Sequence, residues 1–196
     1  MKQTLKLAAL AALVCLLLSV LTFAGYSQGI RDRVVRLHVP AHDNSPAQQA
    51  LKLKVRDAVS EETANLLNGI TDRAAVLACL RENLSTLQTV AEQCIKNEGY
   101  SLPVTAELTT DYFTTREYDA GTYPAGVYDT LRITIGDGAG RNWWCVLYPP
   151  LCVSAATKAP TAEDVLTSGQ CTVLATPRYA VRFKLVEWWE SLRKQK

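Results

Sequence analysis

The sequence predicts an α+β domain: an N-terminal strand, a helical hairpin packed on a mainly antiparallel sheet, and a short C-terminal helix. Three observations predict this class. Two segments of the first half have apolar residues at helical spacing, the second half alternates apolar and polar residues, and Gly- or Pro-containing turns separate these segments. The chain has 196 residues, of which 48% are hydrophobic and 20% charged. This length and composition suit one globular domain, which we expect to span residues 28–196.

An uncharged apolar stretch, residues 7–24, follows Lys2 and Lys6. As a helix it would be about 27 Å long, which is long for the core of a signal peptide and slightly short for a membrane span. Small residues suited to signal-peptide cleavage are Thr22 with Ala24, and Gly25 with Ser27. Residues 1–27 are therefore expected to be either a cleaved signal peptide or an anchor that contacts the membrane through residues 7–24. In both cases the body is exported, with the lysines on the cytoplasmic side.

The first predicted elements are a strand and a helix. Residues 35–39 alternate apolar and polar side chains, which indicates a half-buried strand that ends at Pro40. Ser45 suits the N-cap of the following helix, Pro46 its first position and Gln48 the reciprocal capping-box position. Asn68-Gly69 is typical of a helix C-terminus.

A second helix is expected to begin with Thr71 as its cap and to end at Gly99. Its apolar residues recur in steps of three and four, which is also the spacing of a coiled coil. Three heptads are too few to predict a dimeric coiled coil, so we expect a helical hairpin against the sheet. The apolar residues are Leu77, Leu80, Leu84, Leu87, Ala91 and Cys94.

The strands of the second half are predicted from alternation. Residues 102–109 form a strand in which Pro103 requires an edge position or a place at the strand start. A second β segment lies near residues 112–118, and residues 123–126 form a turn. The clearest strand covers residues 127–135, and the Gly136–Gly140 turn is expected to join it in a hairpin to a return strand over residues 142–148.

Towards the C-terminus the pattern weakens and then returns. Residues 153–177 are rich in Ala, Thr, Ser, Pro and Gly and predict an exposed, mobile loop. Residues 180–186 alternate as a strand does, and residues 187–192 complete the chain as a short helix.

Charge and motif spacing argue against several classes of function. Without Lys2 and Lys6 the chain carries 19 basic and 19 acidic side chains and has no Lys/Arg run, so nucleic-acid binding is not expected. His38 and His42 are separated by Pro40, and Cys-x-x-Cys pairs are absent, so no metal site is expected. The glycine turn lacks a P-loop ending, so no phosphate-binding cofactor is expected either. Asp57, Glu61 and Glu62 are interpreted as a solvated helix face.

The cysteines suggest a disulfide more than a catalytic thiol. Cys145 and Cys152 flank Pro149-Pro150, and a bridge between them would contribute about 2–3 kcal/mol in the chain-entropy model. Two buried thiols are the alternative. A nucleophilic Cys145 with His38 or His42 as its base has no sequence signature to support it.

The double tryptophan allows two interpretations. In a strand, Trp143 and Trp144 point to opposite faces of the sheet. One of them enters the core, and the other is either covered within the fold or contacts a partner, since exposed tryptophan is frequent in binding hot spots.

Several motifs occur in an order that resembles one known family. The most specific is Asn142-Trp143-Trp144-Cys145 followed by Pro149-Pro150-Leu151-Cys152. The others are residues 35–39, 43–45, 54–59, 123–126 and 181–192. The sequence resembles the stage II sporulation protein R family over roughly residues 30–192, with a gap at the 153–177 loop. Cys79, Cys94 and Cys171 are not part of the family pattern.

The resemblance implies an exported intercellular signal without a catalytic centre. Members are made in the forespore, enter the space between forespore and mother cell, and trigger a membrane-embedded aspartic-type protease from its extracytoplasmic face. That protease removes the pro-sequence of the sigma E factor. The expected binding patch comprises Gly136, Asp137, Gly138, Asn142, Trp143 and Trp144. A structural envelope protein and an exported thiol hydrolase are the rival classes.

Overall fold

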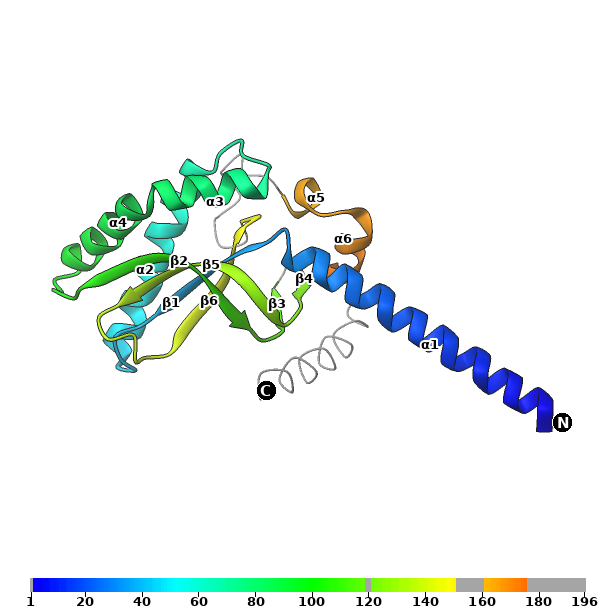
Figure 1. The fold of residues 1–196 in the computed structure, drawn as a ribbon. Helices are drawn as coiled ribbons and strands as arrows, with labels where there is room; N and C mark the ends of the chain where they lie inside the picture. The colour runs from blue at the N-terminus through cyan, green and yellow to red at the C-terminus, as the bar shows by residue number, and fades with distance from the viewer. Residues whose placement is uncertain (1, 119–120, 151–160, 176–196) are drawn as a thin grey trace.

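A four-stranded sheet with the strand order β2-β5-β1-β6 forms the centre of the domain, and β3 and β4 form a separate two-stranded sheet (Figure 1). The computed structural model describes residues 2–118, 121–150 and 161–175. The α+β class is confirmed, since the sheet is mainly antiparallel and helices pack on it. The strands are β1 (Val35–Pro40), β2 (Val104–Phe113), β3 (Arg116–Tyr118), β4 (Gly121–Tyr123), β5 (Gly126–Ile135) and β6 (Asn142–Tyr148). The helices are α1 (Lys2–Arg31), α2 (Pro46–Leu66), α3 (Arg73–Glu82), α4 (Leu84–Asn97), α5 (Ala162–Val165) and α6 (Ser168–Ala175).

Strand β1 lies inside the sheet, parallel to β5 and antiparallel to β6. Leu37 is opposite Leu131 on one side and Cys145 on the other. All six residues of β1 are buried, so the expectation of a half-buried strand was wrong. The reason is its central position: side chains pack on both faces of β1, as they do in a strand covered from both sides.

The insertion of β1 also overturns the predicted hairpin. Strands β5 and β6 do not pair with each other, because β1 lies between them. The Gly136–Gly140 turn therefore passes over the end of β1 instead of joining two neighbouring strands. An Asp-Gly turn specifies a local reversal, and it carries no information about a distant strand that fills the gap.

Strand β2 is a single ten-residue strand at the sheet edge, antiparallel to β5. Pro103 directly precedes it, in agreement with the predicted edge position. The second predicted segment near residues 112–118 is divided between the end of β2 and the short strand β3.

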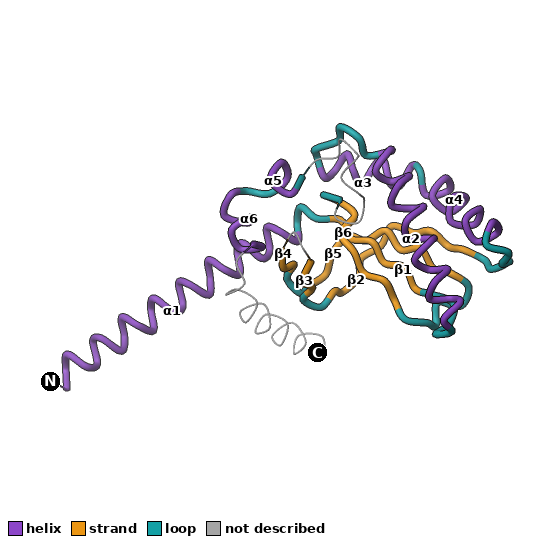
Figure 2. Tube along the Cα trace, turned by 180° about the vertical axis from the view of Figure 1, so that it is seen from behind, coloured by secondary structure: helices purple, strands orange, loops and turns teal. Residues whose placement is uncertain are grey.

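Helices α2, α3 and α4 pack on one face of the sheet (Figures 1 and 2). The N-cap of α2 is Ser45, whose side chain accepts a hydrogen bond from the Gln48 amide at 3.3 Å. The reciprocal half of the capping box is absent, because Gln48 Oε1 is buried without a partner among the described residues. The core on this face joins Val55 and Val59 of α2 to Leu80, Leu87 and the inward-facing residues of the strands.

The second predicted helix is two helices. Asp72, and not Thr71, caps α3 by accepting a hydrogen bond from the Ala75 amide at 2.9 Å. Asn83 ends α3, and its side chain donates to the Cys79 carbonyl at 2.8 Å. The apolar seam continues through the break, with Leu80, Leu87 and Ala91 fully buried, so the predicted packing against the sheet is confirmed.

The other face of the sheet carries a second core cluster near the end of α1. It contains residues of α1, β2, β4, β5, β6 and α6. The expected loop at residues 153–177 is wrong for its described part, because α5 and α6 occupy residues 162–165 and 168–175. Val173 and Leu174 of α6 are buried in this cluster. The strand and helix expected at residues 180–192 lie outside the described residues.

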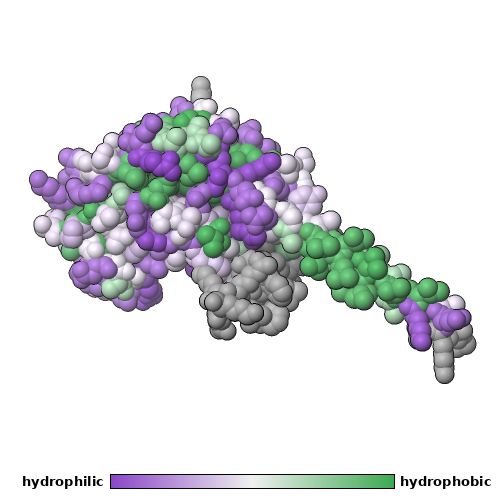
Figure 3. Space-filling view, in the orientation of Figure 1, coloured by the Kyte–Doolittle hydropathy of each residue, from purple (hydrophilic) through white to green (hydrophobic). Residues whose placement is uncertain are grey.

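Helix α1 extends from the domain as a long rod (Figure 1). Its segment Gln3–Arg31 is long and apolar enough to cross a membrane, by length and composition. Figure 3 shows the apolar surface of this rod, with hydrophilic residues near its free end. This helix is compatible with either a signal peptide or an anchor.

Replacement of Leu37 tests the central position of β1. Leu37→Ala is expected to lower the free energy of unfolding by about 2–5 kcal/mol, because it leaves a cavity in the core between the sheet and the helices. Val127→Ala, at a strand position that is 54% exposed, is the control and is expected to change it by less than about 0.5 kcal/mol. Urea unfolding of both variants measures the difference. Equal effects would contradict the buried position of β1.

Candidate functional site

The Gly136–Gly140 turn lies at the end of the sheet that is far from α1 (Figure 1). Strand β5 begins beside Arg31 at Gly126 and runs for ten residues, about 30 Å, before it reaches this turn. We call the turn, together with residues 41–44, Arg141 and Asn142, the tip. Gly136 and Gly138 have φ values of 56° and 63°, which glycine adopts without strain. Four of the six predicted patch residues therefore lie in the tip: Gly136, Asp137, Gly138 and Asn142.

The segment that follows β1 braces the tip. His42 Nδ1 accepts a hydrogen bond from the Asp137 amide at 3.1 Å. The Gly140 amide donates to the Ala41 carbonyl at 2.8 Å, and the Arg141 amide donates to Asn44 Oδ1 at 2.7 Å. The turn is therefore held by the end of the strand that it crosses.

Helix α2 adds a second brace through Lys52, which is only 5% exposed. Its ammonium group donates to the Arg141 carbonyl at 3.0 Å and to Gln49 Oε1 at 2.7 Å. Burial lowers the pKa of Lys52, and the nearby charges of Arg141 and Arg56 lower it further. Against this fixed backbone, the Asp137 side chain is 82% exposed and Asn142 is also exposed. The tip is thus a rigid surface with exposed polar side chains, which suits recognition of a partner.

The two tryptophans lie on opposite faces of β6, as the sequence predicts. Trp143 packs on the helix-covered core, with the Arg56 guanidinium 4.4 Å from its ring centroid. Trp144 lies on the other face and stacks on the His38 ring, with centroids 3.8 Å apart. Both are partly buried. Their predicted role in partner binding is not tested by this placement.

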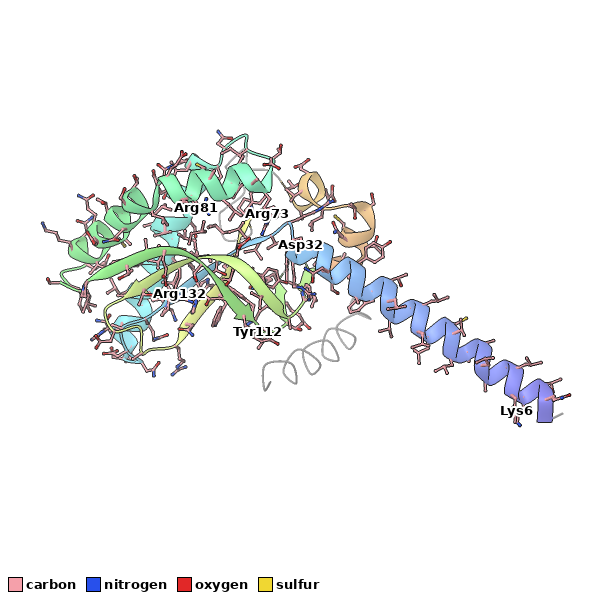
Figure 4. All side chains as sticks on the ribbon, viewed as in Figure 1. Lys6, Asp32, Arg73, Arg81, Tyr112 and Arg132 are labelled. Carbon is pink, nitrogen blue, oxygen red and sulfur yellow. The ribbon has the colours of Figure 1, made fainter. Side chains whose placement is uncertain are left out.

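Sequence reasoning missed a row of polar side chains that crosses the sheet on the face that carries Trp144. We call Glu107, Asp111, Arg132 and His38 the polar row. The strand register places Glu107, Arg132, His38 and Trp144 side by side on four strands. Arg132, in the middle of the sheet in Figure 4, donates to Glu107 Oε1 at 2.7 Å and forms an ion pair with Asp111. His38 Nδ1 lies 2.8 Å from Asp111 Oδ2, and it carries the proton because a carboxylate only accepts.

The position of Asp111 explains its ionisation. Burial alone raises the pKa of this carboxyl group, but hydrogen bonds from Arg132 and His38 outweigh it, and the pKa is lower than usual. The hydrogen bond to Asp111 in turn raises the pKa of Arg132. Alternation in residues 102–109 predicts the strand but not this pairing, because the partners come from distant strands.

Arg36 was also missed, and it is fully buried. Its guanidinium carbon lies 4.3 Å from the Phe113 ring centroid, 5.2 Å from that of Tyr128 and 5.6–5.7 Å from those of Tyr118 and Tyr123. Nη2 donates to the Tyr118 hydroxyl at 2.8 Å, whereas Nε and Nη1 have no hydrogen-bond partner among the described residues. The available signal was the high density of aromatic residues between residues 112 and 128.

We call Arg36 and the four rings around it, those of Phe113, Tyr118, Tyr123 and Tyr128, the aromatic cage. Burial is the main influence on the pKa values of its ionisable groups. It lowers the pKa of Arg36 and raises the pKa of Tyr123 to about 12. It also raises the pKa of Tyr128. The tyrosines therefore stay neutral at physiological pH, and the positive charge of Arg36 interacts with their ring faces.

The cysteines and histidines are placed unfavourably for thiol catalysis. Cys145 is disulfide-bonded, while Cys152 lies outside the described residues, so their pairing stays a prediction. The free cysteines among the described residues are Cys15, Cys79, Cys94 and Cys171. Burial raises the pKa of Cys94 and of Cys171, which disfavours the nucleophilic thiolate.

Both histidines have acidic neighbours: His38 is paired with Asp111, and His42 Nδ1 lies 3.7 Å from Asp137 Oδ2. Within the part of the chain that the structure describes, no group of three or more His, Cys, Asp or Glu residues is arranged to hold a metal ion.

The tip, the aromatic cage and the polar row all lie in a segment with a known sequence pattern. The sequence profile of stage II sporulation protein R matches residues 31–158. The chain belongs to the stage II sporulation protein R family. It is also 36% identical over 123 residues to stage II sporulation protein R of Bacillus subtilis strain 168, across 63% of this chain and 55% of that relative. The match thus spans about half the length of the curated relative, and no solved structure matches the chain.

Membership in the stage II sporulation protein R family supports a role in sporulation. The family is named for a stage of spore formation and not for an enzyme class. The N-terminal apolar helix precedes the matched region and is consistent with either export or anchoring of the matched domain.

Arg36 variants test the aromatic cage. Arg36→Lys is expected to lower the free energy of unfolding by about 1–3 kcal/mol, because the compact ammonium is strongly hydrated and loses the stacking of the planar group. Arg36→Met removes the buried charge at similar length and is expected to be at least as stable as Arg36→Lys. Thermal and urea unfolding give the order. A lysine variant with wild-type stability would disprove the cage interpretation.

Asp111→Asn tests the polar row through its pH dependence. Because the folded pKa of Asp111 lies below the unfolded value of about 3.9, its stabilisation is complete above that value and is lost as pH falls through the folded pKa. The variant is expected to be about 1–3 kcal/mol less stable at pH 7, with a smaller difference from the wild type below about pH 4. Urea unfolding at both pH values measures this. A constant difference would argue against an ionised Asp111, and exposed Asp137→Asn is the control.

Proposed function

We propose that this chain is an exported intercellular signal that activates a membrane-embedded aspartic-type protease during endospore formation. The activated protease then removes the pro-sequence of the sigma E factor in the mother cell. The observation that carries this proposal is the family match over residues 31–158, which contains the whole sheet and the tip. The proposed location is the space between forespore and mother cell, and the proposed contact is with the extracytoplasmic face of the protease.

The tip supports a role in binding. An activating ligand must bind the active state of its receptor more tightly than the inactive state. A rigid surface loses little conformational entropy when it binds, and the tip is held by hydrogen bonds from residues 41–44 and from Lys52. Its exposed side chains, Asp137 and Asn142, are the proposed contacts.

The chemistry of the described residues favours a binding role over thiol hydrolysis. His38 is paired with the Asp111 carboxylate, His42 Nδ1 accepts the Asp137 amide hydrogen bond, and burial raises the pKa of two of the free thiols. Trp143 and Trp144 are partly buried on the two faces of β6, directly after Asn142 of the tip, so we assign them a positioning role.

Reconstitution in a non-sporulating bacterial host tests the proposal. The host expresses the cognate protease and the sigma-factor precursor with or without this chain, and processing is followed by immunoblot. Processing that depends on the chain is expected. Unchanged processing, with the chain shown to be folded and exported, would reject protease activation and favour the structural envelope protein.

Charge reversal at the tip tests the contact surface in the same assay. Asp137→Lys combined with Asn142→Arg is expected to reduce processing about tenfold or more, which corresponds to about 1.4 kcal/mol of lost binding. Glu61→Lys combined with Asn65→Arg makes the same change of three charges at exposed positions of α2; it is the control and is expected to have no effect. If the tip variant is folded and fully active, the receptor contact lies elsewhere.

A further inference from the structure

We propose that α1 is not removed after export and remains as a membrane anchor whose last turns belong to the folded domain. The partner of this surface is a lipid bilayer. Residues 7–22, which precede the first buried residue of the helix, form about 24 Å of helix, a length that a hydrocarbon layer of about 30 Å accommodates by local thinning. The large apolar side chains of this stretch are about half or more exposed: Leu7, Leu10, Leu13, Val14, Leu16, Leu17, Leu18, Val20 and Leu21.

The end of the same helix is buried instead of exposed. Phe23 is 4% exposed, and Ser27 and Ile30 are 0% exposed. Their spacing of four and three residues places them on one face of the helix. Phe23 and Ile30 belong to the second core cluster together with Val173 and Leu174 of α6. One continuous helix therefore has a part that suits lipid and a part that forms protein core.

Close contacts hold this end of α1 in place. A Cβ atom on Gly169 of α6 would lie 2.6 Å from the Tyr26 ring, so the two helices touch with a glycine at the contact. Arg31 Nη1 donates to the Ala125 carbonyl at 2.9 Å, just before β5. The base of α1 is thus attached to both α6 and the sheet.

These contacts coincide with the positions at which a signal peptide would be cut. Cleavage after Ala24 would remove Phe23 from the core, and cleavage after Ser27 would remove both Phe23 and Ser27. A protease acts on locally unfolded chain, so once the domain has folded, either cut requires the docked helix to separate from α6 and unwind. The docked end of α1 therefore protects the junction.

The connection between anchor and domain is short. Only three residues, 32–34, connect the end of α1 at Arg31 to the start of β1 at Val35. In Figure 4, Lys6 lies near the free end of the rod, and Asp32 lies where the helix meets the domain. The domain is therefore seated at the membrane surface, without a flexible linker, and the tip points away from the anchor.

The mass of the exported chain tests retention. The full chain with a C-terminal tag is expressed in a bacterial host, membranes are washed with alkaline carbonate, and the intact mass is measured. We expect the chain in the membrane fraction with residues 7–24 present. A soluble product that begins at Gly25 or Gln28 would overturn the proposal. This readout is independent of protease activation, so the two proposals fail separately.

Variants of α6 test whether docking protects the junction while the sequence of α1 stays intact. Val173→Ser weakens the buried contact, and Val173→Ala is the milder change in case the first does not fold. The cleaved fraction is expected to rise at least threefold in the order wild type, Val173→Ala, Val173→Ser. Thr172→Ser, at the exposed neighbouring position, is the matched control. Equal cleavage in all four proteins would show that docking does not protect the junction.

Discussion

The buried charge of Arg36 is the constraint on which the arrangement of the strands depends. A cation in a protein interior requires compensation, and here the rings of Phe113, Tyr118, Tyr123 and Tyr128 surround it from β2, β3, β4 and β5. The Tyr118 hydroxyl also donates to the Trp144 carbonyl of β6 at 3.1 Å. One side chain on β1 thus fixes the position of the small sheet relative to the large one.

The long strands give the domain two distinct ends. At one end, Arg31 and the buried residues of α1 meet the start of β5. At the other end, β1 and β5 finish beneath the braced tip. Because β1 and β5 are parallel neighbours inside the sheet, the two ends are connected by extended, hydrogen-bonded backbone. A protein that must present one surface while another is held in place benefits from such stiffness.

The sequence was informative wherever local chemistry decides the structure. Ser45-Pro46 starts α2, Pro103 precedes an edge strand, and the register of β6 separates Trp143 from Trp144 as alternation predicts. The failures share a cause, which is dependence on distant residues. The gap between β5 and β6 is filled by β1, and the polar row requires Asp111, Arg132 and His38 to meet from three strands. Weak apolar patterning also hid α6, whose short length gives little periodicity.

The position of β1 has a consequence for the order of events during folding. β1 follows α1 in the chain, yet it pairs with β5 and β6, which come after three helices and β2. Such pairing between distant segments is intrinsically slow. A chain that crosses a membrane from its N-terminus therefore delivers its central strand first and completes the sheet only after residue 148 has emerged. Under the proposed export, assembly of the native surface is coupled to the completion of translocation, and a partly exported chain would have no finished tip to present.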